Sequence, residues 1–311
     1  MSVRPHIPVM ADEVVQALDP VDGGIYVDGT FGAGGYSQAI LYEADCRVIG
    51  IDCDPEAVAA GAEVAARHEG RLELIQGRFS GMAELAAGAG AARVQGVTLD
   101  LGVSSMQLDH VERGFSFAAD GPLDMRMSQS GESAADVVNS RAQDELADII
   151  YQYGEERRSR AVARAIVRAR EAAPIVRTAE LANVVAKAVG GAGRKHPATR
   201  TFQALRIYVN SEIEELRQGL VAAERLLAPQ GRLAVVSFHS LEDREVKQFL
   251  IERSGGQPRG SRHRPSISDG RPATFQLARR TAIKPSAAEI TANPRARSAR
   301  LRVAQRTGAP A

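Results

Sequence analysis

Residues 25–35 constrain the fold more than any other part of this sequence. They read IYVDGTFGAGG, a short β-branched and aromatic run that ends at Asp28 and passes into a loop with glycines at 29, 32, 34 and 35. Glycine has no Cβ, so the backbone of such a loop can approach a ligand closely. The segment predicts a strand-to-helix turn built around a ligand. The alternative, that the glycines serve only close packing, stays open on this segment alone.

The spacing of the glycines and the next predicted strand indicate which ligand. The pattern G-x-x-G-x-G-G matches neither the dinucleotide fingerprint G-x-G-x-x-G nor a P-loop, which argues against a pyrophosphate or triphosphate. The predicted strand over residues 47–52 ends in Asp52, where a carboxylate could accept two ribose hydroxyls. S-adenosylmethionine combines adenosine with an amino-acid tail and carries no phosphate. We therefore expect it as the cofactor, with Asp28 meeting its ammonium group.

Composition excludes several classes of protein. The 311 residues carry 39 basic and 38 acidic side chains, a net charge of +1, so a polyanion site would have to come from local clustering. The only cysteines, Cys46 and Cys53, lack the spacing of a disulfide framework or a zinc site, and no ligand set indicates a metal. There is no long apolar run. We expect a cytoplasmic protein with no membrane association.

Strands and helices alternate in the first third of the chain and again near its end. Strands are predicted over 47–52, 72–75 and 94–101, with a helix over 55–67 between the first two; this rhythm is typical of a parallel sheet. From about 106 to 208 the pattern is helical, including 142–151, 155–171 and 178–189, and a long helix over 209–227 precedes strands at 232–238 and 298–303. We expect a core of residues 1–105 and 209–311, an inserted helical domain at 106–208, and a mobile loop at 254–275.

Asp100 is the candidate catalytic residue, because it stands at the carboxyl end of the fourth predicted strand, where open α/β sheets bind their reactants. An exocyclic amine of a base is a poor nucleophile, and a carboxylate that accepts its N–H would activate it. Alignment of amine, methyl and sulfur could contribute several kcal/mol by positioning alone. The alternative role for Asp100 is to cap the following turn.

Basic residues concentrate in the second half of the chain. Arg160, Arg164 and Arg168 recur at i, i+4 spacing on one predicted helix, as expected for a phosphate-binding face or for a solvated face paired with neighbouring acids. A second cluster lies in the segment 193–203. The clusters favour RNA as the substrate, through Arg160, Arg164, Arg168, Arg194, Lys195, His196 and Arg200.

Two other enzyme classes fit the sequence poorly. Ser237, His239 and Asp243 are close in sequence, but no G-x-S-x-G elbow accompanies them, which argues against a hydrolytic triad. The glycine spacing argues against a nicotinamide oxidoreductase. Among the aromatic residues, Phe79 follows the third predicted strand, where adenine is expected.

The sequence also resembles the ribosomal RNA small subunit methyltransferase H family, the bacterial 16S rRNA cytosine-N4 methyltransferases, nearly from end to end. The resemblance is carried by HIPV from His6, DGTFGAGG from Asp28, DLGVSS from Asp100, RGFSF from Arg113, DGPLDMRM from Asp120, YGEER from Tyr153, HPATRTFQ from His196, SFHSLEDR from Ser237 and NPRARS from Asn293.

The resemblance implies an α/β fold, a Rossmann-like S-adenosylmethionine-dependent methyltransferase core with an inserted helical domain. It implies methylation of N4 of a decoding-centre cytidine in 16S rRNA, on the small ribosomal subunit. Relatives often have histidine at position 36 and proline at 106, where this chain has tyrosine and methionine. The cofactor contacts implied by position are Gly34, Gly35, Tyr36, Asp52, Phe79, Asp100 and Gln107.

Two further functions stay open at this point. The Asp/Asn-Pro-Pro-Tyr motif of many amino-methylases is absent after the fourth predicted strand, which disfavours DNA amino-methylation without excluding it. The second alternative is a non-catalytic assembly factor that binds RNA and has an adenosine pocket. The oligomeric state is open, with a homodimer as one alternative.

Overall fold

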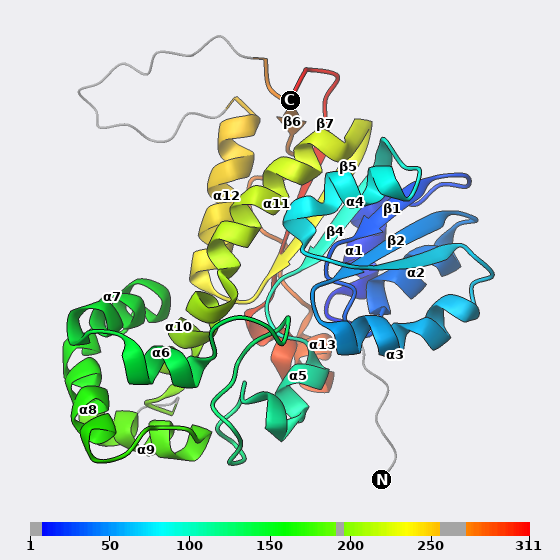
Figure 1. The fold of residues 1–311 in the computed structure, drawn as a ribbon. Helices are drawn as coiled ribbons and strands as arrows, with labels where there is room; N and C mark the ends of the chain where they lie inside the picture. The colour runs from blue at the N-terminus through cyan, green and yellow to red at the C-terminus, as the bar shows by residue number, and fades with distance from the viewer. Residues whose placement is uncertain (1–7, 191–195, 256–271) are drawn as a thin grey trace, which may run out of the picture. The chain divides into compact units, whose positions relative to one another are not determined.

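The computed structural model describes residues 8–190, 196–255 and 272–311. These residues form two compact units, one from residues up to 102 together with those from 213 onward, the other from residues 103–212. The first unit contains a sheet covered by helices and the second is helical (Figure 1).

The sheet of the first unit has the strand order β3-β2-β1-β4-β5-β7-β6. Strands β1 to β5 are parallel to their neighbours, whereas β7 runs antiparallel to both β5 and β6. The strand bounds are β1 Ile25–Asp28, β2 Arg47–Asp52, β3 Leu72–Gln76, β4 Val94–Asp100, β5 Leu227–Ser237, β6 Phe275–Gln276 and β7 Arg300–Arg306.

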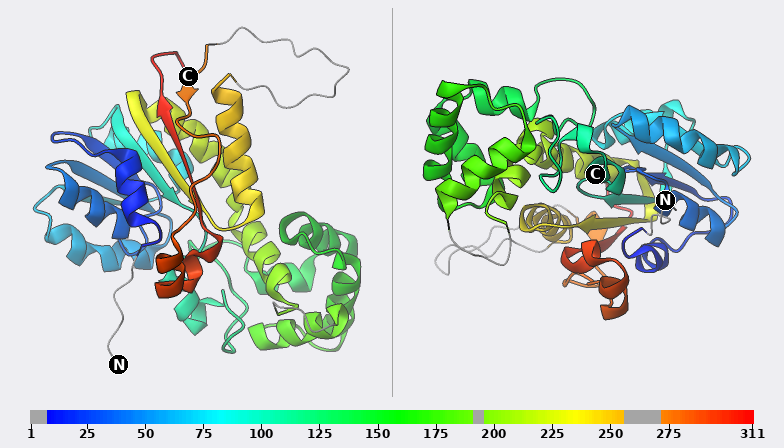
Figure 2. Two further views of the ribbon diagram at one scale, coloured as in Figure 1. Left: turned by 180° about the vertical axis from the view of Figure 1, so that it is seen from behind. Right: turned by 90° about the horizontal axis from the view of Figure 1, so that it is seen from below.

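Helices cover both faces of this sheet (Figure 2), because successive side chains of a strand point to opposite faces and both sets are apolar. In β1, Tyr26 packs with one layer and Val27 with the other. The first layer contains α1 Ala11–Leu18, α2 Gly35–Glu43 and α3 Pro55–Ala66, and the second contains α4 Met82–Gly88, α11 Glu212–Leu226 and α12 Ser240–Arg253. A further helix, α13 Ala287–Ala292, has no buried residue.

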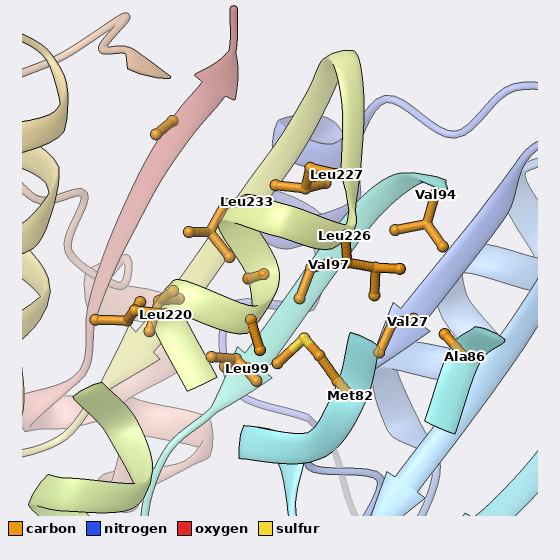
Figure 3. Packing of buried hydrophobic residues seen from close by; sticks show 14 of the residues in the cluster. Val27, Met82, Ala86, Val94, Val97, Leu99, Leu220, Leu226, Leu227 and Leu233 are labelled. Atoms are coloured by element: carbon orange, nitrogen blue, oxygen red, sulfur yellow. The ribbon is translucent and has the colours of Figure 1, made fainter. Parts of the chain in front are cut away.

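The second layer forms the larger core, shown in Figure 3. Strand side chains interlock with those of α4 and α11, and burying each valine or leucine contributes about 1.5–3 kcal/mol. Labelled members are Val27, Met82, Ala86, Val94, Val97, Leu99, Leu220, Leu226, Leu227 and Leu233.

The helical unit has a hydrophobic core of its own, to which Leu146, Val162 and Leu181 contribute. Asn210 ties an irregular segment to its last helix, because its Nδ2 donates to the carbonyl of Met125 (2.8 Å) and its Oδ1 accepts from the amide of Met127 (2.8 Å). The helices are α5 Ser105–Asp109, α6 Ala134–Ser140, α7 Gln143–Gly154, α8 Ser159–Ala172, α9 Thr178–Val189 and α10 Thr199–Asn210.

Three sequence predictions need correction. The helix predicted over 209–227 begins at Glu212, because Ser211 adopts a left-handed φ of 53° and separates α10 from α11. Strand β5 begins at Leu227, earlier than predicted, with a shift of register against β4. The predicted mobile loop 254–275 ends too late, since Phe275 is 1 % exposed and begins β6; residues 256–271 of that loop lie outside the described residues.

Candidate active site

The glycine loop between β1 and α2 lies across the carboxyl ends of three parallel strands. The amide of Gly29 donates to the carbonyl of Thr98 in β4 (3.0 Å), and the amide of Phe31 donates to the carbonyl of Ile51 in β2 (2.9 Å). Gly34 then adopts a φ of 76°, which a side chain would strain, and as the N-cap of α2 it has no side chain with which to cap the helix. The loop therefore presents backbone groups where β1, β2 and β4 end.

Asp28 points into the loop. Its side chain is 1 % exposed, and its two carboxylate oxygens accept from the Ser37 hydroxyl (2.8 Å) and the Thr30 amide (3.3 Å). Burial raises the pKa of Asp28 to about 6, although these hydrogen bonds oppose the shift. Above that pH its negative charge is held beneath the loop.

Asp52 links β2 to the same loop. Its Oδ2 accepts from the amide of Gly32 (2.7 Å) and its Oδ1 from the amide of Asp54 (2.9 Å). Burial raises its pKa, and the backbone donors counteract this. The amide of Cys53 is a third backbone donor to this carboxylate, which has about four acceptor positions in all and so keeps capacity for a ligand hydroxyl.

Asp100 contains the unsatisfied polar atom of this site. Its backbone amide donates to the Thr30 hydroxyl (2.6 Å), whereas its Oδ1 is buried and has no hydrogen-bond partner among the described residues. Burial and the nearby charges of Asp28 and Glu242 raise the pKa of Asp100 to about 8. A buried acceptor without a donor is uncommon in a folded protein, and a bound group is one reason to retain it.

Tyr36 lies beside Asp100, and the hydrogen bond between their side chains opposes the rise in the pKa of Asp100. Its hydroxyl donates to the carbonyl of Val9 (2.5 Å) and the side chain is buried. Burial, followed by the negative charges of Asp100 and Asp28, raises the pKa of Tyr36 well above its usual value. Tyr36 is therefore a neutral phenol at physiological pH.

Replacing Asp100 with asparagine is expected to stabilise the ligand-free protein at pH 8. The folded carboxyl retains its proton up to a pKa of about 8, whereas in the unfolded chain it ionises near its usual value. Folding therefore binds a proton, and this residue lowers the free energy of unfolding progressively as pH rises from about 4 to 8. The asparagine side chain does not titrate, so the gain should be of the order of a few kcal/mol at pH 8 and smallest near pH 4. Melting temperatures of both proteins across this range measure it; a gain independent of pH would contradict the raised pKa.

The two remaining cofactor candidates lie in different units. Phe79, in the turn after β3, is half-buried. Its ring packs closely on Gly219 of α11, since a Cβ at residue 219 would lie 2.3 Å from it. Gln107 belongs to the helical unit, where its Oε1 accepts from the amide of Ser104 (3.0 Å) in the capping box of α5.

Sequence reasoning missed two polar residues of this site, Thr30 and Ser37. Both are hydroxyl residues in or beside the glycine loop, and both contact a candidate acid, Thr30 at Asp100 and Ser37 at Asp28. Their position in the loop was a signal, but only the folded backbone brings Thr30 next to a residue 70 positions away.

The basic face of α8 is present in the helical unit. Arg160, Arg164 and Arg168 are exposed on one side, and none forms an ion pair or hydrogen bond with the part of the chain described. Glu156, one of the acids expected to pair with them, is instead buried and 3.6 Å from Arg200.

His196 and Arg200 lie near the start of α10 in the same unit. His196 is exposed and stacks on Phe117, with ring centroids 4.7 Å apart. The other two candidates of this cluster, Arg194 and Lys195, lie outside the described residues.

The residues of the hydrolytic alternative do not form a triad. The Ser237 hydroxyl donates to the carbonyl of Arg300 (3.4 Å), and the Asp243 carboxylate pairs with Arg302 (2.7 Å). His239 caps the first turn of α12. Each side chain has a structural role of its own.

The reversed β7, the strand order and the glycine loop with acids at the ends of β1, β2 and β4 define a class, the Rossmann-like S-adenosylmethionine-dependent methyltransferase fold. Residues 3–307 match the model of the MraW methylase family. The chain is 60% identical over 309 residues to ribosomal RNA small subunit methyltransferase H of Rhodopseudomonas palustris, covering 98% of this chain and 92% of that one.

The protein of the same name from Paramagnetospirillum magneticum is 59% identical over 313 residues, which cover all of this chain and 98% of the relative. This chain belongs to the MraW methylase family. An rRNA methylase of known structure from Streptococcus thermophilus is 10% identical, covering 96% of this chain and 93% of that one, with a TM-score of 0.41, a likeness too distant to add to the assignment. In the described ranges no helix has the length and apolar character needed to span a membrane.

Proposed function

We propose that this protein methylates N4 of a decoding-centre cytidine in 16S rRNA of the small ribosomal subunit, with S-adenosylmethionine as methyl donor. Family membership supports the chemistry and the curated relatives are named as small-subunit rRNA methyltransferases. The observation that carries the proposal is the buried Oδ1 of Asp100 at the end of β4, beside the glycine loop, which has no hydrogen-bond partner in the described part of the chain.

The residues of the first unit fit an adenosine-containing sulfonium cofactor. Asp52 retains acceptor capacity for a ribose hydroxyl beyond its backbone donors, the amides of Gly32, Cys53 and Asp54. Asp28 accepts from Ser37 and Thr30, so we assign it to shaping the loop and attracting the ammonium through its charge. The bound donor would supply an electrophilic methyl group. The proposed cofactor residues are Asp28, Gly34, Gly35, Tyr36, Asp52, Phe79, Asp100 and Gln107.

Asp100 would accept the N–H of the target amine and then its proton. The amine nitrogen would form its bond to the methyl carbon as the carbon–sulfur bond of the donor breaks, and S-adenosylhomocysteine would leave as a neutral thioether. The nitrogen, now positively charged, would have to lose a proton to give the neutral methylated base. A carboxylate whose pKa is raised to about 8 is a better proton acceptor at neutral pH than an ordinary aspartate, once it is ionised. A cationic ligand nearby favours that ionisation.

The helical unit would bind the RNA through the unpaired arginines of α8 and the cluster near α10. The exposed guanidinium groups of Arg160, Arg164 and Arg168 have no partner within the described ranges and are available to phosphates, which release counterions on binding. The exposed imidazole of His196, stacked on Phe117, is available to an unstacked base. We assign Arg160, Arg164, Arg168, Arg194, Lys195, His196 and Arg200 to RNA binding.

Labelled S-adenosylmethionine and small subunits that lack the modification provide the direct test. We expect label in 16S rRNA, recovered as N4-methylcytidine by mass analysis of nucleosides, and about 10²–10⁴-fold slower labelling with Asp100→Ala. Label at another atom would remove the N4 assignment. Label in duplex DNA but not in subunits would favour a DNA amino-methylase, and binding of both ligands without transfer would favour an assembly factor.

A further inference from the structure

The ring of Phe31, in the middle of the glycine loop, lies in a slot made by three glycines from three different elements. The side chain is 3 % exposed. A Cβ would meet the ring at 2.7 Å from Gly34 of the loop, 2.7 Å from Gly50 of β2 and 2.4 Å from Gly61 of α3. Leu74 of β3 closes the slot, at 2.8 Å and 2.7 Å from the same Cβ positions on Gly50 and Gly61.

This arrangement differs from ordinary core packing. Glycine inside a strand or helix is about 0.5–1 kcal/mol less favourable than alanine. Gly50 is internal to β2 and Gly61 is internal to α3. A Cβ at either position would overlap the Phe31 ring. The strand and the helix are thus each destabilised locally by a glycine, and the two glycines together leave room for one aromatic ring.

The backbone of Phe31 is held as firmly as its ring. Its amide donates to Ile51 of β2 (2.9 Å), and its carbonyl accepts from Gly34 (2.7 Å). Its neighbours are the two loop residues that contact the site acids, since Thr30 accepts from the Asp100 amide (2.6 Å) and Gly32 donates to Asp52 Oδ2 (2.7 Å). Displacement of the ring would therefore shift the loop where it contacts Asp100 and where it contacts Asp52.

We propose that Phe31 is a positioning residue for cofactor binding, acting by locking the loop in its binding conformation through the slot formed by Gly34, Gly50 and Gly61. The proposal rests on the proposed cofactor site. A loop ordered before binding loses less conformational entropy when the ligand arrives, so the ring contributes to affinity without touching the ligand.

The first experiment compares Phe31→Ala with Leu226→Ala. Leu226 is also almost fully buried in the first unit, but it lies at the end of α11, away from the glycine loop. The next residue, Leu227, pairs with Val94 at the amino ends of β4 and β5, whereas the loop lies at the carboxyl ends of the strands. Both variants should melt at lower temperature. At a temperature where both are folded, we expect Phe31→Ala to weaken S-adenosylhomocysteine binding more than 10-fold by calorimetry and Leu226→Ala to change it less than 2-fold. Equal effects would reduce Phe31 to core packing and overturn the proposal.

The second experiment tests the slot by rescue. Gly61→Ala should weaken the same affinity, although alanine favours a helix, and Phe31→Leu in the same chain should restore much of it by vacating the space near residue 61. Gly88→Ala is the matched control, because Gly88 is also helical and its Cβ would meet nothing within 4 Å. If the effects of the two substitutions on affinity simply added in the double variant, the two residues would not share one space, which would contradict the proposed slot.

Hydrogen exchange separates this inference from the proposed function. In ligand-free protein the amides of Phe31, Gly32 and Gly34 should exchange faster in Phe31→Ala than in Leu226→Ala. If the wild-type protein binds no S-adenosylhomocysteine, the cofactor assignment fails, while this measurement still reports whether the ring orders the loop. Unchanged exchange would refute the locking role.

Discussion

Asp100→Ala is expected to lower turnover in rRNA methylation by about 10²–10⁴-fold, the usual contribution of a positioned proton acceptor. The Asp100 Oδ1 atom has no partner among the described residues, and Tyr36, which hydrogen-bonds the carboxyl group, keeps the Val9 carbonyl as an acceptor when that group is removed. The backbone amide that anchors Thr30 is retained in the variant. Cofactor affinity should therefore change far less than turnover, by no more than a few-fold.

Single-turnover kinetics with labelled donor, alongside calorimetry with S-adenosylhomocysteine, would measure the two effects separately. Asp45→Ala is a suitable control, because that carboxylate is exposed and precedes β2 at the other end of the strands. The pH profile adds a second readout. The pKa of Asp100 is raised to about 8 in the ligand-free protein, so kcat/KM should increase with pH up to that region and then level off. Wild-type turnover in the Asp100→Ala variant would exclude the proton-acceptor role.

Replacing Arg160, Arg164 and Arg168 together with glutamine is expected to weaken RNA binding by about 10–100-fold at physiological salt. Each arginine that binds a phosphate contributes about one to the slope of log affinity against log salt, so the slope should become shallower by about three in the triple variant. Because the three side chains are exposed and form no ion pair within the described ranges, the melting temperature should change little. Filter binding to small-subunit RNA at several salt concentrations measures both the affinity and the slope.

A single-residue comparison controls for net charge. Arg164→Gln and Arg177→Gln each remove one positive charge from the helical unit, but Arg177 already pairs with Asp120 at 2.9 Å. We expect Arg164→Gln to lower the salt dependence and Arg177→Gln to leave it nearly unchanged. Equal effects would mean that only the overall charge of the unit matters, and that α8 is a solvated face.

Periodicity predicted most of the regular structure, because the signals are local. The strand predicted at 47–52 and the helix predicted at 178–189 have the observed bounds of β2 and α9. Local signals failed where a single backbone conformation decided the outcome, as at Ser211 between α10 and α11, or where a distant partner did. Phe275 stands in polar, glycine-rich surroundings, and it becomes a strand residue only by pairing with Arg306 of β7.

The candidate site divides in the same way. The acids at 28, 52 and 100 were predictable, because each ends an apolar strand and parallel strands end at one edge. Their individual states were not. Asp28 is sealed by Ser37, Asp52 is bound to Gly32, and Asp100 Oδ1 is left without a donor in the described structure, differences that depend on where the loop backbone runs.

The sequence by itself determined the class of fold, the glycine loop after the first strand and the identity of the acids around it, since these follow from residue type and order along the chain. Only the tertiary structure decided that Phe31 is enclosed by Gly34, Gly50 and Gly61, and that Thr30 meets Asp100. Burial, pKa and steric room are properties of neighbours in space, and these neighbours come from strands and helices far apart in the chain.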